Sequence, residues 1–389
     1  MSDFSRVFLV GHSHYRALLL GLARRFKAEF SSEIHIYCAT EQERAYWKAA
    51  LDDATVQSVN VDNYRYRTAD QPVGDPQQVL ETARRVEAYL GLTINKLAVS
   101  DRHLGRGYAL AGFKHPRSRR SENSSYLQMV NGFCAQVEFW RKEFEDKCPT
   151  LVLTGGSIEA LIARKQGVAF RTIAGSRYQD YHQWVHNEFF ENPFVQRAFE
   201  AVEEAADTQV ENPYGLHMTL RRKFVQDVGL LGMMRRSAHI AARHVYWRLR
   251  GYEKARGYYP LEEIAYVWRR RRDLRALDRM SQPLASLEGR PFVYYPLHTE
   301  PETALQWLSP EYFYQHSCIA ALSRDLPAGV MLAVKETYEA VGRRPTDFYG
   351  QLADFKNVVI LDSMELGLEV VNRANAVAIS GYSFGPVRA

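Results

Sequence analysis

The chain has 389 residues, 46% of them hydrophobic and 24% charged, with a formal net charge of +5. This length favours two domains, and the composition is that of a globular protein. No stretch approaches the roughly 18–20 apolar residues of a membrane-spanning helix, and the amino terminus lacks the basic region of a signal peptide. The four cysteines are widely spaced and form no Cys-x-x-Cys pair, which argues against a zinc site and a disulfide framework. We therefore expect a cytoplasmic protein with no metal site.

The first part of the chain alternates between strand and helix patterns. Strands are predicted over residues 6–10, 33–38, 56–61, 96–100, 150–154 and 169–173, with helical patterns between most of them. This alternation predicts a parallel sheet with helices on both faces. We expect a Rossmann-like domain over residues 1–176.

The alternation breaks over residues 177–289, which are aromatic, rich in arginine and predicted to be mainly helical. It resumes with strands predicted over 291–295, 330–334, 357–361 and 375–380. The sequence thus predicts an α/β protein of two Rossmann-like domains, with 290–389 as the second domain and 177–289 as a helical segment that bridges them.

Charged residues follow two consecutive strands of the predicted second domain. His298 and Glu300 come after the strand at 291–295, and Lys335 and Glu336 follow the strand at 330–334. The carboxyl ends of parallel strands share one edge, where open α/β sheets bind ligands. His298 and Glu300 could bind sugar hydroxyls or a ribose, and Lys335 could neutralise a departing phosphate. Glu336 could contact the ribose or hold the lysine; the alternative for this pair is a surface ion pair.

Turns of the first domain offer further candidate contacts. His12 and Ser13 lie between the first strand and its helix, and Gly155 and Gly156 precede another helix. Free N–H groups at a helix amino terminus can hold a phosphate or a carboxylate. The alternatives are a capping serine, an ordinary loop histidine and a structural glycine turn.

The segment Asp101-Arg102-His103 follows the strand predicted at 96–100. A reaction at a hydroxyl group needs a base to take its proton, and an Asp or His on a loop can supply it. We predict Asp101 as the base; the alternative is that Asp101 pairs with Arg102 and braces the loop.

Several short motifs recur in an order that resembles the capsular and surface polysaccharide biosynthesis glycosyltransferases. These are GT-B-fold enzymes, some of which transfer Kdo from CMP-Kdo. The matching residues are Tyr295-Pro296-Leu297, Glu300-Pro301-Glu302, Val334-Lys335-Glu336, Arg344, Phe348-Tyr349, Asn357-Val358 and Ser380-Gly381, with Ser100–Gly107 and Ala174–Arg177 upstream.

The resemblance implies a metal-independent transferase with no cofactor besides a nucleotide-sugar co-substrate, CMP-Kdo being the family-level expectation. Thr337-Tyr338 stands where the family often has His-Pro, so UDP-sugars stay open. The family's last turn normally opens further elements, and we expect the second domain to be truncated. The implied site residues are, for catalysis, Asp101 and His103; for the acceptor, His12, Ser13, Arg102, Gly155 and Gly156; and for the donor, His298, Glu300, Lys335, Glu336, Ser380 and Gly381.

The sequence therefore predicts a glycosyltransferase that acts on a growing or lipid-linked glycan of a capsule or cell surface. The alternatives are a non-catalytic or truncated glycan-binding homologue and a sugar-nucleotide epimerase. Basic stretches at 114–120 and 268–275 are either solvated faces or surfaces for anionic lipid or glycan, which would place the protein at the inner face of the membrane. They accompany no nucleic-acid-binding motif, and we expect no nucleic acid partner.

Overall fold

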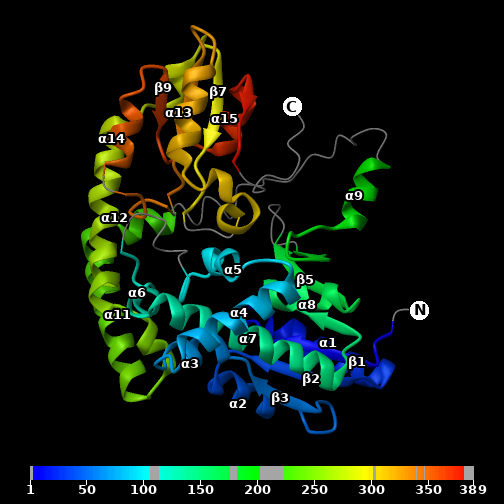
Figure 1. Ribbon diagram of the computed structural model, residues 1–389. Coiled ribbons are helices and arrows are strands. Elements are labelled where there is room, and N and C mark those ends of the chain that lie inside the picture. Colours follow the sequence, from blue (N-terminus) through cyan, green and yellow to red (C-terminus); the bar gives the residue numbers. More distant parts are fainter. Residues whose placement is uncertain are drawn as a thin grey trace. The chain divides into compact units, whose positions relative to one another are not determined.

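The computed structural model describes residues 3–105, 114–175, 182–201, 222–300, 304–338, 340–345 and 347–380. The chain forms two compact units (Figure 1). Unit 1 comprises Met1–Lys96 and Ser124–Glu211, and unit 2 comprises Leu97–Asn123 and Asn212–Ala389. The domain bounds at 176 and 289 stay a prediction.

Unit 1 holds a six-stranded sheet and most of the helices that flank it. Its strands are β1 (Arg6–Val10), β2 (Glu33–Cys38), β3 (Ser58–Val61), β4 (Leu151–Leu153), β5 (Ala169–Gly175) and β6 (His182–Val185). Its helices are α1 (Arg16–Phe30), α2 (Glu41–Ala50), α3 (Tyr64–Ala69), α4 (Pro76–Leu90), α7 (Tyr126–Lys147), α8 (Ser157–Lys165) and α9 (Pro193–Glu200). The strand order is β3-β2-β1-β4-β5-β6, parallel except for β6.

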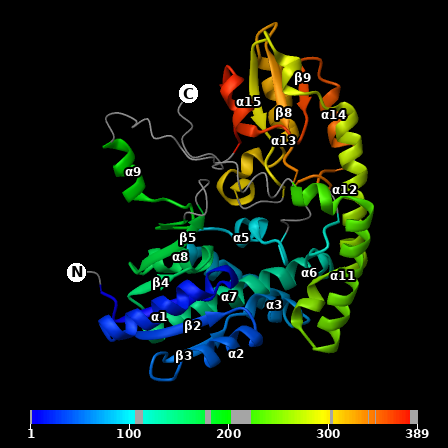
Figure 2. The ribbon, with the colours of Figure 1, turned by 180° about the vertical axis from the view of Figure 1, so that it is seen from behind.

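Alternate residues of β1 point to opposite faces of this sheet, and each face is covered by different helices. Val7 and Leu9 pack with α1 and α2 in one buried cluster. Phe8 points the other way, with its ring centroid 5.5 Å from that of Phe144 on α7. Figures 1 and 2 show α7 and α1 on these two faces. The Rossmann-like layering predicted from the alternation is therefore confirmed.

One predicted strand of this sheet is wrong. Residues 96–100 belong to α5 (Ile94–Ser100), and the sixth strand is the antiparallel β6. Ile94, Leu97 and Ala98 are all buried, at positions i, i+3 and i+4, which is the spacing of one helical face. Asp101 therefore follows a helix, and no strand end positions it. The chain passes from unit 1 to unit 2 within α5.

Unit 2 holds a four-stranded parallel sheet in the order β10-β7-β8-β9. Its strands are β7 (Phe292–Pro296), β8 (Met331–Lys335), β9 (Val358–Leu361) and β10 (Ala376–Val377). Its helices include α6 (Arg119–Asn123), α11 (Leu230–Leu249), α12 (Pro260–Met280), α13 (Gln315–Asp325), α14 (Phe348–Ala353) and α15 (Gly367–Arg373). All four strands predicted for the second domain are present, the last shorter than expected.

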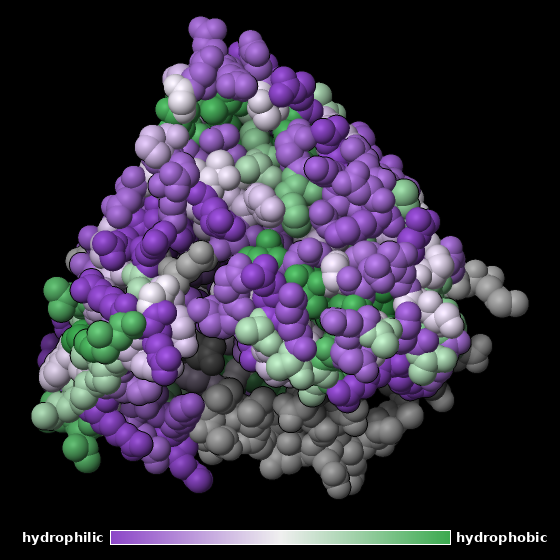
Figure 3. Space-filling view, turned by 90° about the horizontal axis from the view of Figure 1, so that it is seen from below, coloured by the Kyte–Doolittle hydropathy of each residue, from purple (hydrophilic) through white to green (hydrophobic). Residues whose placement is uncertain are grey.

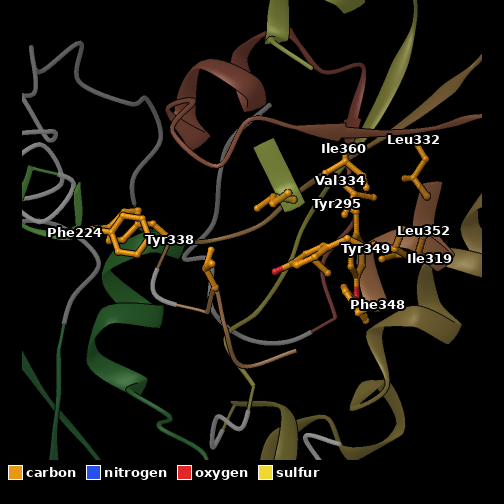
Figure 4. Packing of buried hydrophobic residues seen from close by; sticks show 13 residues of the cluster. Phe224, Tyr295, Ile319, Leu332, Val334, Tyr338, Phe348, Tyr349, Leu352 and Ile360 are labelled. Carbon is orange, nitrogen blue, oxygen red and sulfur yellow. The ribbon is translucent and has the colours of Figure 1, made fainter. Parts of the chain in front are cut away.

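The core of unit 2 lies between this sheet and its helices. Figure 4 shows Tyr295, Val334 and Ile360, from three neighbouring strands, packed with Tyr349 and Leu352 of α14. A second buried cluster fills the other face, against α15. The fold is therefore two Rossmann-like α/β units, as the sequence predicted.

The segment predicted to be helical supplies α9, α11 and α12, together with β6. Two arginines of its basic stretch hold unit 2 together and are not a solvated face. Arg270 donates to the Tyr338 carbonyl at 3.4 Å, and Arg271 donates to the Val228 carbonyl at 3.0 Å. Among the described residues, no helix is long and apolar enough to cross a membrane.

We predict that Gly342 is required by close packing. It has a φ of +86°, and an added Cβ would lie 2.7 Å from Arg270 Cγ and 3.0 Å from Arg270 Cα. Gly342→Ala should lower the free energy of unfolding by about 2–4 kcal/mol, from the left-handed backbone and the overpacking together. Gly289→Ala is the matched control, because Gly289 has a φ of +74° but open space around it. Urea denaturation that gives equal losses for the two variants would contradict the packing argument.

Candidate functional site

The predicted donor residues of unit 2 lie at one edge of its sheet. β7 and β8 are parallel neighbours, and Pro296 is in register with Lys335. Leu297 N–H donates to the Lys335 carbonyl at 2.9 Å beyond the end of β7. The loops that carry His298 and Glu336 therefore leave the sheet side by side.

A buried arginine joins these two loops. Arg344 is 3% exposed. Its Nε lies 2.6 Å from Glu336 Oε2, and its Nη2 lies 3.0 Å from Glu336 Oε1. Nη1 lies 3.0 Å from Glu300 Oε1, and Nη2 donates to the His298 carbonyl at 2.6 Å. The Arg344 guanidinium thus holds both loops in place, with the paired geometry that favours arginine over lysine.

Two more side chains complete this network. Gln315, at the start of α13, accepts from His298 N–H at 2.7 Å and donates to Glu300 Oε1. Tyr349 on α14 donates to Glu336 Oε2 at 2.9 Å. We call Glu300, Gln315, Glu336, Arg344 and Tyr349 the carboxylate–arginine network.

The electrostatics of the network follow from burial. Burial opposes the charge of Arg344, but Glu336 and Glu300 outweigh it and hold the pKa of the guanidinium above its ordinary value. Burial raises the pKa of Glu300, and Arg344 offsets only part of that rise. Burial and the Glu336 charge also raise the pKa of Tyr349, so its hydroxyl stays a donor. One guanidinium thus balances one of the two carboxylates, and the raised pKa of Glu300 shifts that group toward its neutral form.

Within this network Glu336 is a positioning residue, because its carboxylate is taken up by protein donors. Its side chain is fully buried and also accepts from Thr337 N–H at 2.8 Å. With Arg344 and Tyr349 as further donors, this carboxylate positions its neighbours. Lys335, the last residue of β8, is 6% exposed, and its Nζ lies 3.5 Å from the Glu336 carbonyl oxygen.

Ser380 lies beside this edge as well. Tyr295 Oη donates to Ser380 Oγ at 2.9 Å, and both residues are buried. Gly381 and Glu302 lie outside the described residues. A hollow of about 510 Å³ in unit 2 is lined by Arg290, Pro291 and Phe292, so it lies at the opposite, amino-terminal end of β7.

Asp101, Arg102 and His103 form a tight turn after α5. Asp101 Oδ1 accepts from the N–H groups of His103 at 2.8 Å, Leu104 at 2.6 Å and Gly105 at 3.3 Å. The carboxylate therefore braces the loop, which was the alternative role foreseen for it, and it does so through backbone N–H groups.

The same turn contributes to a cluster of positive groups within unit 2. Burial, and then the charges of Arg343, Arg117, His103 and Arg102, lower the pKa of His115 to about 2. His115 is therefore neutral, and the other four groups gather around it. Arg343 precedes the Arg344 of the carboxylate–arginine network, so positive charge accumulates on the chain segment next to it.

The predicted acceptor residues of unit 1 lie at the point where its strand order reverses. β1 is next to both β2 and β4, and the Leu9–Leu153 register aligns the ends of β1 and β4. His12 and Ser13 leave β1, and Gly155 and Gly156 follow β4. This reversal is where open α/β sheets bind ligands, and the fold brings the four predicted residues to it.

Close packing accounts for the residue type at some positions of this edge and not at others. An added Cβ at Gly155 would lie 2.9 Å from Glu159 Cβ and 3.0 Å from Phe170 Cε2, so packing requires the glycine. His12 is exposed, with its ring 5.0 Å from that of Tyr15. Burial, and then the neighbouring His14, lower the pKa of His12 and favour its neutral form.

Unit 1 also contains a buried acid, Glu159, and a partly buried one, Asp62, that sequence reasoning missed. Glu159 accepts from Gly156 N–H at 3.0 Å, and Asp62 accepts from Trp140 Nε1 at 3.1 Å. Burial, and then the Asp62 charge, raise the pKa of Glu159 to about 7. Burial also raises the pKa of Asp62, although Gln136 and Trp140 oppose the rise.

Sequence reasoning also left Arg344, Gln315 and Tyr349 out of the predicted site. Arg344 and Tyr349 belong to the motifs that carry the family resemblance, so a signal existed for them. No pattern marked Gln315, which is seventeen positions after its partner His298. Among the described residues, no three His, Cys, Asp or Glu side chains group closely enough to hold a metal ion.

Comparison with known proteins gives structural likenesses but no match by sequence. No family model matches the chain, and no curated protein matches it by sequence. Among solved structures, the chain is similar to the UDP-GlcNAc 2-epimerase from Neisseria meningitidis bound to UDP-GlcNAc. The sequence identity is 10%, the match covers 96% of this chain and 77% of that one, and the TM-score is 0.23. A likeness of this size carries no argument about ligand or reaction.

We predict that Arg344→Met destabilises the protein by about 3–5 kcal/mol, because two buried carboxylates lose their cation. Arg324→Met is the control: its side chain is 76% exposed in a pair with Asp325, and we expect little change. Adding Glu300→Gln to the Arg344→Met variant should restore part of the loss, since one unpaired charge is removed. Urea denaturation measures all three, and a loss for Arg344→Met no larger than the control's would contradict the assigned role.

A second prediction concerns Glu159 and pH. Its pKa is about 7 in the folded chain and near 4.5 when unfolded, so the folded state binds the extra proton between these values. The free energy of unfolding should therefore fall as pH rises from about 4.5 to 7, by about 3 kcal/mol, and level off above. Glu159→Gln should remove this fall, because the glutamine amide does not titrate. The variant should keep its fold at this turn, because the amide oxygen can still accept from Gly156 N–H. Parallel stability–pH curves for the two proteins would contradict the prediction.

Proposed function

We propose that the chain is a glycosyltransferase that uses a nucleotide-activated sugar, and that the donor binds at the carboxyl edge of the unit 2 sheet. The observation that carries the proposal is the convergence of the motif residues at this edge. His298 and Glu300 follow β7, Lys335 ends β8, and Arg344 joins the two loops. Glu300, Lys335 and Arg344 are among the motif residues that carry the resemblance to polysaccharide biosynthesis glycosyltransferases.

The charges at this edge suit a nucleotide phosphate. Arg344 occupies the carboxylates of Glu300 and Glu336, which reduces their repulsion of an anionic ligand. Lys335 then provides a cation at the strand end, where the leaving phosphate needs its charge balanced. The positive groups around His115 add a further attraction within the same unit.

The remaining roles are proposed from the resemblance. The donor is a nucleotide sugar such as CMP-Kdo, and the acceptor is a glycan of a capsule or cell surface that contacts His12 and Ser13 of unit 1. Asp101 and His103 are the proposed catalytic residues. Because Asp101 also braces its turn, loss of activity in Asp101→Asn alone would not identify it as the base. The pH–rate profiles of Asp101→Asn and His103→Gln, compared with that of the unmodified chain, show which of the two groups titrates in the reaction.

We predict that the protein binds a nucleotide and that Lys335→Met weakens the binding by about 1.5–3 kcal/mol, because a charge-assisted contact is lost. Titration calorimetry with CMP, UDP, GDP and ADP measures this, and CMP is expected to bind best. Lys356→Met is the matched control, an exposed lysine in the loop before β9. Unchanged affinity in a folded Lys335→Met protein would overturn the proposed donor site.

Product analysis then separates the transferase from the alternatives. A transferase releases nucleotide from its donor only when a glycan acceptor is present. An epimerase converts the nucleotide sugar without an acceptor, and a non-catalytic homologue binds without turnover; either result would contradict the proposal.

A further inference from the structure

The helical hairpin of unit 2 exposes large apolar side chains at its tip. We define the hairpin tip as residues 245–261, where α11 ends and α12 begins. Leu249 is 82% exposed and Leu261 79%, with Val245 at 57% and Tyr246 at 48%. Val245 and Leu249 are four residues apart and therefore share a face of α11. Figure 3 shows hydrophobic residues gathered among hydrophilic ones at the left of the view, the side on which Figure 1 places α11 and α12.

The tip is a well-packed element. Glu263 pairs with Arg243 at 2.5 Å and with His244 at 2.9 Å, which ties α12 to α11 just behind the tip. The rings of Trp247 and Tyr258 lie 5.3 Å apart and pack the connection between the helices. The exposed leucines are therefore held outward by an ordered support.

Basic side chains surround these leucines. Arg248, Arg250, Lys254 and Arg256 are all exposed, and none forms an ion pair with an acidic side chain that the structure describes. Of the acids at the start of α12, Glu263 pairs with Arg243 and His244 of α11, and Glu262 lies 4.0 Å from Lys114 Nζ. The tip thus combines exposed apolar surface with four exposed cations that pair with no described acid.

The basic stretch predicted at 114–120 adds to the same surface. Tyr259 N–H donates to the Pro116 carbonyl at 2.8 Å, so the stretch lies against the hairpin. Arg117 lies over the Tyr258 ring, 5.6 Å from its centroid, and is itself exposed. Two segments far apart in sequence therefore build one basic, apolar surface.

We propose that the hairpin tip docks on an anionic lipid bilayer, with Leu249 and Leu261 entering the boundary between head groups and acyl chains. Apolar side chains flanked by Arg and Lys are the pattern by which amphipathic elements bind such a surface. A second copy of this chain is a poor occupant, because two basic tips would face each other. The inference does not depend on the proposed transferase activity.

The test is co-sedimentation of the full chain with vesicles. Binding is expected to vesicles of phosphatidylcholine with phosphatidylglycerol, to weaken as salt is added, and to be far weaker for phosphatidylcholine alone. Leu249→Ser with Leu261→Ser should lower the binding constant by about tenfold for each leucine. Arg248→Gln with Arg250→Gln should lower it about fivefold per charge and reduce the salt dependence.

Leu231→Ser is the matched control, because Leu231 is 81% exposed on the same helix. It lies eighteen residues from Leu249, about 27 Å along α11. Binding of this variant should equal that of the unmodified chain. Circular dichroism checks that every variant is folded.

Three results would overturn the proposal. One is equal binding to neutral and anionic vesicles, and another is tip variants that bind as well as Leu231→Ser. The third is a stable dimer in sedimentation velocity that the leucine double variant abolishes, since the tip would then be an interface between copies.

Discussion

A buried guanidinium sets the geometry of the candidate donor edge in unit 2. Arg344 cannot stay charged in the interior without partners, and it takes them from Glu336, Glu300 and the His298 carbonyl. These partners come from the loops after two neighbouring strands. The same bonds that satisfy one charge therefore fix the course of both loops, and Lys335 ends its strand between them.

The supporting residues explain why this arrangement is rigid. Gln315 binds the backbone of His298 from α13, and Tyr349 reaches Glu336 from α14. Both helices pack on the face of the sheet that holds Tyr295 and Val334 (Figure 4). Hydrophobic packing thus places the helices, and the helices place the polar groups that hold the loops. A site of this kind resists small shifts because its polar and apolar contacts share the same elements.

At the sheet edge of unit 1, some of the predicted site residues have a structural role. Gly155 is compelled by close contact with Glu159 and Phe170, and Glu159 is occupied by the backbone of the turn. The structural role of these residues is therefore accounted for without a ligand. His12 and Ser13 are less constrained by packing and are the stronger candidates for contact with an acceptor at this reversal of strand order.

The sequence by itself was enough to predict two sheets of mostly parallel strands. Runs such as 292–295 and 331–334 are continuous and apolar, a pattern that indicates a buried strand without knowledge of its distant contacts. It also placed His298, Glu300 and Lys335 at one edge, since parallel strands end together. It misread 96–100, where Leu97 and Ala98 fit a short strand as well as a helix until tertiary packing buries one helical face.

Only the tertiary structure decided which charged side chains bind other groups of the protein and which are exposed to solvent. Arg270 and Arg271 lie in the steepest basic stretch, yet they donate to carbonyl groups of Tyr338 and Val228. Arg248 and Arg250 belong to no basic run in the sequence, yet both lie exposed in the hairpin tip. Gln315 meets His298 across a loop. Local pattern cannot resolve these cases, because the partner of a long polar side chain is chosen by how helices pack and not by which residues are near in sequence.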